Sequence, residues 1–125
     1  MSDEATISAD QIIDIFAKHV PVAIAIFDTE MRYLYVSQRF KDDYGLHDRE
    51  VVGLCHYDVF PEIPERWKEF HRRSLQGESF SRDDDPLLRA DGRIQWTYWE
   101  LSPWFSKDEQ IGGLVLFAEE ITQHR

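Results

Sequence analysis

The side chains with most capacity for chemistry lie in the middle of the chain. Cys55, His56 and Asp58 are close together, but no second pair of ligands follows at the spacing of a zinc site. The acidic run Asp83–Asp85 precedes a proline and is typical of a solvated loop or sheet edge. His71 differs, because it interrupts an apolar helical stripe and could orient a bound molecule. No phosphate-binding loop or nucleophile motif is visible, so we expect no catalytic residue and no metal site.

A helix is predicted to carry His71. It should run from Pro64 to Gln76, because Trp67, His71 and Leu75 recur every four residues and Gly77 follows as a stop. Apolar positions in the strands downstream would face this helix. We therefore expect a ligand pocket between helix and sheet, formed by Trp67, His71, Leu75, Trp99, Leu101 and Leu116. The alternative is that the tryptophans themselves fill this space, since pockets and cores share this composition.

Three antiparallel strands are predicted between Pro86 and Thr122. They would be joined by a turn at Asp91-Gly92 and by a polar connection over residues 106–110. Glu100 marks the outward face of the middle strand, which places Trp99 inward. The outward face is also apolar and needs cover, which a second copy of the chain could supply. The expected dimer surface consists of Ile12, Phe16, Trp96, Tyr98, Val115 and Phe117.

The first half of the chain is predicted to mix strands with short helices. A helix over Ser8–Val20 should end at Pro21, and a strand pair should follow over Val22–Asp28 and Arg32–Ser37. Ser37 is a suitable cap for a short helix. A second short helix is predicted from Asp48 to Gly53.

Composition limits the class of protein. The 125 residues suffice for one domain, and 42% hydrophobic residues suffice for a packed core. The net charge of -10 argues against nucleic acid, whose phosphates attract basic proteins. One cysteine permits no internal disulfide and suits the reducing cytoplasm. The absence of a long apolar run or signal peptide predicts a cytoplasmic domain that does not insert into a membrane.

The order of these elements resembles the PAS domains of bacterial signalling proteins. The residues that carry the resemblance are IAIFDTEMRYLYVSQRF, REVVG, VFPEIPERWKEFHRRSLQGE and RADGRIQWTYWELSPWFSKDEQIGGLVLFAEEIT. It implies an α+β fold, in which a five-stranded antiparallel sheet carries helices on one face around a small cavity. The implied division is an N-terminal cap helix over residues 1–20 and a PAS sensory domain over residues 21–125.

The resemblance also implies a regulatory role without enzymatic activity. Similar domains precede histidine kinases of two-component systems and diguanylate cyclases, and such an output domain is absent from this chain. PAS domains often end in an Asp-x-Thr motif that passes the signal to a C-terminal effector. Glu120-Ile121-Thr122 stands at that place, so Glu120 and Thr122 are the expected transmission residues.

The family also suggests cofactors. Haem-binding PAS domains ligate iron through a histidine on the corresponding helix, so haem at His71 stays an alternative, although the sequence disfavours it. Flavin at Cys55 is disfavoured because the motif around that cysteine is out of register. Two other functions remain open. The chain could be a dimerisation or protein-interaction module without ligand, or a small cone-shaped α+β enzyme such as an isomerase.

Overall fold

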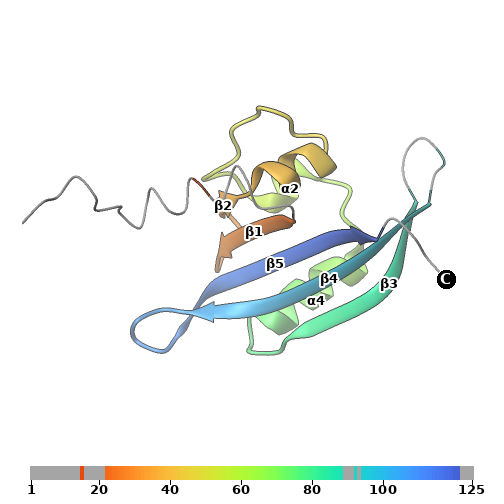
Figure 1. Ribbon diagram of the computed structural model, residues 1–125. Helices are drawn as coiled ribbons and strands as arrows, with labels where there is room; N and C mark the ends of the chain where they lie inside the picture. Colours follow the sequence, from red (N-terminus) through yellow and green to blue (C-terminus); the bar gives the residue numbers. More distant parts are fainter. Residues whose placement is uncertain (1–14, 16–21, 89–91, 93, 122–125) are drawn as a thin grey trace, which may run out of the picture.

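A five-stranded antiparallel sheet is the frame of the molecule (Figure 1). The computed structural model describes residues 15, 22–88, 92 and 94–121. Along the sheet the strand order is β2-β1-β5-β4-β3, which confirms the expected α+β fold. The strands are β1 Ala23–Asp28, β2 Tyr33–Val36, β3 Phe80–Leu88, β4 Ile94–Phe105 and β5 Ile111–Ile121.

The long pair of β4 and β5 sets which side chains face inward. Trp99 lies opposite Ala118, and Leu101 lies opposite Leu116. Trp99 is 5% exposed and Leu101 is 1% exposed, whereas Glu100 between them is exposed. The inward direction predicted for Trp99 from the position of Glu100 is therefore confirmed.

Three helices are described, and they lie between β2 and β3 in the chain. Their bounds are α2 Gln38–Asp43, α3 His56–Val59 and α4 Glu65–Ser74. The predicted helix from Pro64 to Gln76 corresponds to α4, which Pro64 precedes as the N-cap residue. Figure 1 shows α4 lying across β4, and α2 packs against β1 at the other end of the sheet. The helices and the inner sheet face enclose the site described below.

Two local predictions were wrong. Residues 48–53 form turns and no helix, because Gly53 and the next residue, Leu54, pair with the first residue of β2: Gly53 N–H donates to Tyr33 O, and Tyr33 N–H donates to Leu54 O. The first of the three late strands begins at Phe80 rather than Pro86 and includes the acidic run. The pairing of β3 with β4 continues through this acidic segment, with a register irregularity between Arg82 and Asp85.

Several predictions fall on residues that the structure does not describe. These include Ile12, Phe16 and Thr122, and nearly all of the expected cap helix over residues 1–20. No described helix is long and apolar enough to cross a membrane.

Candidate functional site

A cavity of about 640 Å³ lies between the helices and the inner face of β4 and β5. Five of the six predicted pocket residues line it: Trp67, His71, Trp99, Leu101 and Leu116. Leu75, the sixth, lies just after α4, where it packs against the core instead. The other lining residues are Phe40, Tyr44, His56, Val59, Phe60, Pro61, Glu62, Ile63, Pro64, Thr97 and Ala118.

Two tryptophans form an aromatic wall of the cavity. The rings of Trp67 and Trp99 meet edge to face, with their centroids 4.9 Å apart. This geometry is favourable for aromatic pairs and keeps both rings on one side of the cavity. The cavity therefore remains beside the tryptophans, which do not fill all of the space between α4 and the sheet.

His71 is held in this wall by a tyrosine from the neighbouring helix. Its Nδ1 lies 2.7 Å from the hydroxyl of Tyr57, and the residue is 4% exposed. Burial lowers the pKa of His71 to about 4 because it disfavours the charged ring. With this pKa, His71 is neutral near pH 7.

His56 is a second cavity histidine, and sequence analysis considered it only as a metal ligand. It begins α3, its Nδ1 lies 2.5 Å from the hydroxyl of Tyr33, and its ring centroid lies 5.6 Å from that of His71. Burial, with a smaller contribution from the charge of His71, lowers the pKa of His56 to about 3. The sequence offered little signal for it, because α3 is a single turn, too short to show a period.

Thr97 lies on the sheet side of the cavity. It lies on β4 two residues before Trp99, so both side chains point inward. Its Oγ1 is enclosed and has no hydrogen-bond partner among the described residues. An enclosed polar atom without a partner costs free energy, and its lack of accessible surface keeps this hydroxyl out of reach of the cavity contents.

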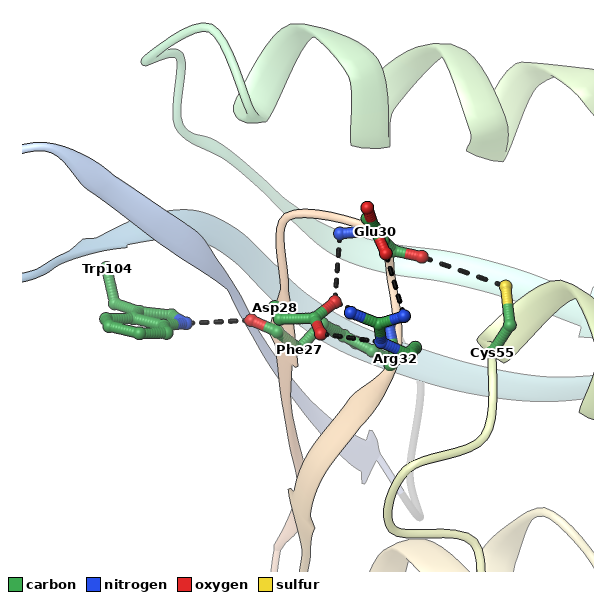
Figure 2. Close-up of polar contacts among 6 residues, drawn as sticks. All are labelled: Phe27, Asp28, Glu30, Arg32, Cys55 and Trp104. Atoms are coloured by element: carbon green, nitrogen blue, oxygen red, sulfur yellow. Dashed lines mark hydrogen bonds and ion pairs between the residues drawn. The ribbon is translucent and has the colours of Figure 1, made fainter.

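Cys55 lies outside the cavity lining, near the β1–β2 turn (Figure 2). Its Sγ contacts the carbonyl oxygen of Glu30 at 3.8 Å. Asp28 Oδ1 accepts the backbone N–H groups of Glu30 and Arg32, and Asp28 Oδ2 pairs with Arg32 Nε at 2.9 Å. Figure 2 also shows Trp104 Nε1 donating to Phe27 O at 2.8 Å. These contacts hold the β1–β2 turn and the strand ends in place, and Cys55 contacts this turn through Glu30.

The geometry around His71 fits hydrogen bonding better than iron ligation. A histidine that binds metal through Nε2 normally donates from Nδ1 to a carboxylate or carbonyl. The partner of Nδ1 is instead a tyrosine hydroxyl, which is itself a donor. Among the described residues, no group of three or more His, Cys, Asp and Glu side chains could hold a metal ion.

The outer sheet face carries the predicted dimer residues of β4 and β5. Trp96, Tyr98, Val115 and Phe117 are each half-buried, and the rings of Tyr98 and Phe117 lie 6.3 Å apart. Glu120, a predicted transmission residue, lies opposite Thr97 in the pairing of β5 with β4. The backbone position of Glu120 therefore neighbours a cavity residue.

Comparison with known families agrees with this architecture. The family described as PAS fold matches residues 17–125. The chain belongs to the PAS family. No curated protein sequence matches it.

Solved structures share the fold at low sequence identity. VqmA of Vibrio cholerae, in complex with a ligand and DNA, is 20% identical with a TM-score of 0.71, and the match covers 94% of this chain and 53% of that chain. The present chain thus spans about half of VqmA. A sensory box histidine kinase from Vibrio cholerae is 17% identical, with a TM-score of 0.64 and 90% of each chain covered. The PAS domain of BvgS from Bordetella pertussis is 22% identical, with a TM-score of 0.64 and coverage of 90% and 86%.

Proposed function

We propose that this PAS domain is a sensory module that binds a small, partly apolar molecule in its cavity. The observation that carries the proposal is the cavity itself, whose mostly apolar wall contains two buried histidines, His56 and His71. The cavity volume of about 640 Å³ falls within the range of small-molecule sites, which is roughly 300–1,000 Å³. Few polar groups on apolar walls are the usual composition of such sites.

The proposed signal passes through the sheet. Thr97 touches the cavity, and its neighbour across the strand pair is Glu120, close to the end of β5. A ligand that packs against Thr97 would favour one arrangement of this strand pair over another. Differential binding of this kind is what a ligand needs in order to shift a conformational equilibrium. Glu120 and Thr122 would then pass the shift to the segment that follows.

The proposed output lies in another domain or protein. A histidine kinase and a DNA-binding receptor, VqmA, are both among the similar structures, so kinase, cyclase and DNA-binding outputs are all candidates. The acidic charge of this domain disfavours direct contact of the domain with nucleic acid. Because VqmA is found with DNA, that charge gives no reason to exclude DNA from the whole protein's function.

The rival functions account for fewer features. An isomerase of the cone-shaped class needs a buried carboxylate, yet Glu62, the described carboxylate that lines the cavity, is exposed. An interaction module without ligand would leave the space beside Trp67 and Trp99 unexplained. Neither rival is needed to explain the half-buried outer sheet face, which a sensory dimer would also cover.

A cavity-filling variant tests the proposal. We expect at least one compound of a broad thermal-shift screen to raise the melting temperature of the natural chain. The same compound should leave Leu116→Trp unshifted, because the indole would occupy the cavity. Leu34→Trp is the matched control, since Leu34 is 46% exposed on β2, and it should respond like the natural chain. A screen without any stabilising compound, or an equal shift in Leu116→Trp, would contradict the proposal.

A further inference from the structure

Two tyrosine–histidine pairs lie side by side at the cavity. Tyr33 holds His56 at 2.5 Å, and Tyr57 holds His71 at 2.7 Å, in both cases through Nδ1. The two imidazole rings meet edge to face, with centroids 5.6 Å apart. Both histidines line the cavity, so the chemistry they present depends on which ring nitrogen carries the proton.

Hydrogen-bond accounting assigns that proton in the first pair. Tyr33 is 0% exposed, and the described residues provide one partner for its hydroxyl, the Nδ1 of His56. If Nδ1 of His56 were the donor, the buried hydroxyl proton of Tyr33 would have no acceptor. An unpaired buried donor costs free energy. Tyr33 must therefore donate, and the neutral ring of His56 carries its proton on Nε2. Tyr57 makes the same contact with Nδ1 of His71 and is half-buried, and we extend the assignment of the proton on Nε2 to His71 from the likeness of the two pairs.

The Nε2 atoms of both histidines are open to a ligand. Neither atom makes a hydrogen bond within the described residues. Among the described residues, the enclosed side-chain nitrogen and oxygen atoms that lack a hydrogen-bond partner are Ser74 Oγ and Thr97 Oγ1. Because neither Nε2 belongs to this enclosed set, both have accessible surface. Since the two residues line the cavity, that surface is available to its contents.

The cavity offers no positive charge to an anion. Its described lining contains no lysine or arginine, and its one carboxylate, Glu62, is exposed. An anionic molecule would lose its hydration without gaining a counter-ion. An uncharged molecule with acceptor atoms would lose less and could accept hydrogen bonds from both imidazoles.

We propose that the cavity selects an uncharged, largely apolar molecule with a carbonyl or similar acceptor group, which receives hydrogen bonds from Nε2–H of His56 and His71. Tyr33 and Tyr57 are positioning residues, because they fix the ring nitrogens that donate. This inference rests on the proposed function and adds the chemical class of the ligand.

Three matched aromatic probes test the selection. Acetophenone has a carbonyl acceptor, ethylbenzene has nearly the same shape without one, and benzoate has a charged acceptor. In NMR titrations of the full chain, acetophenone should bind at least about fivefold more tightly than ethylbenzene, as expected for one neutral hydrogen bond. Benzoate should show no measurable binding.

The outcomes separate this inference from the proposed function. Equal binding of acetophenone and ethylbenzene would leave the ligand cavity intact and overturn the selection of an acceptor, as would preferential binding of benzoate. If none of the probes binds while the thermal-shift screen yields a stabilising compound, the inferred class is wrong although the sensory function stands. Failure of both the probes and the screen overturns both proposals.

A histidine variant and a spectrum locate the donors. His71→Phe should reduce the preference for acetophenone by at least about threefold, whereas His47→Asn, at an exposed site, should leave it unchanged. The ¹⁵N side-chain spectrum of the natural chain needs no variant and should show the proton of His56 and His71 on Nε2. A proton on Nδ1 of these rings would overturn the inference.

Discussion

Neutral histidines make the stability of this domain depend on pH. Burial lowers the pKa of His56 to about 3 and that of His71 to about 4, while an unfolded histidine titrates near about 6.5. As the pH falls below about 6.5, the unfolded chain binds protons that the folded chain does not, so the folded state loses stability. Above that pH both states are neutral at these residues and the effect vanishes.

We expect the free energy of unfolding to decrease as the pH is lowered from 6.5 to 5. In this range carboxylates, which titrate at lower pH, contribute less to the change. The limiting slope is about 1.4 kcal/mol per pH unit for each buried histidine. Denaturant melts at several pH values between 5 and 6.5 measure this slope. His71→Gln should remove one histidine's share, while His47→Asn should keep the natural slope, because His47 is exposed. A flat profile would contradict the neutral, buried state of both rings.

Trp99 should be the most costly of the predicted pocket residues to truncate. It is 5% exposed and contacts the rings of Trp67 and Phe70 at centroid distances of 4.9 and 5.5 Å. Trp99→Ala should lower the free energy of unfolding by about 3–5 kcal/mol. Phe105→Ala, at a residue that is 58% exposed, should change it by less than about 1 kcal/mol. Similar costs for the two variants in a urea melt would refute the assigned core position.

At the scale of elements, Ser37 joins α2 to β1. Its hydroxyl accepts the N–H of Phe40 at the helix start and the N–H of Ile24, and it donates to Val22 O. The sequence predicted the cap, because serine before a helical pattern is a strong signal. The bonds to Ile24 in β1 and to Val22 just before β1 could not be predicted, since they join residues distant in the chain.

Ser37→Ala should lower the free energy of unfolding by about 2–4 kcal/mol, because it leaves two backbone donors without their partner in a buried place. A helix cap alone would account for about 1 kcal/mol. The control is Ser106→Ala, in an exposed turn, with an expected change near zero. Denaturant melts of both variants make the comparison, and a loss of about 1 kcal/mol or less would show that the contacts to β1 contribute little.

Local patterns predicted the elements better than the site. Alternation around Glu100 gave the correct faces of β4, and the four-residue spacing of Trp67 and His71 gave α4 and one wall of the cavity. His56 was not predicted as a cavity residue because α3 is a single turn, too short to show a period. The pairing of His56 with Tyr33 depends on the path of the chain between them, which the sequence does not encode in any local motif.

At the scale of the whole molecule, the outer sheet face should be an interface. Tyr98, Val115 and Phe117 are only half-buried there, and apolar faces of this kind commonly mediate association. We expect a homodimer, and Phe117→Glu should weaken it at least about tenfold, since one unpaired charge would be buried per copy. Val52→Glu, at an exposed residue in a turn, should leave association unchanged. Sedimentation equilibrium tests this, and a natural chain that stays monomeric at high concentration would contradict it.

The most direct test of a ligand site between α4 and the sheet uses the tryptophans as reporters. Trp67 and Trp99 line the cavity, whereas Trp104 bonds to Phe27 O at the end of the sheet, away from the lining. In a ¹H–¹⁵N spectrum, a compound that stabilises the natural chain should shift the indole signals of Trp67 and Trp99 saturably and leave that of Trp104 in place. A saturable shift confined to Trp104, or no shift of Trp67 and Trp99, would contradict the account.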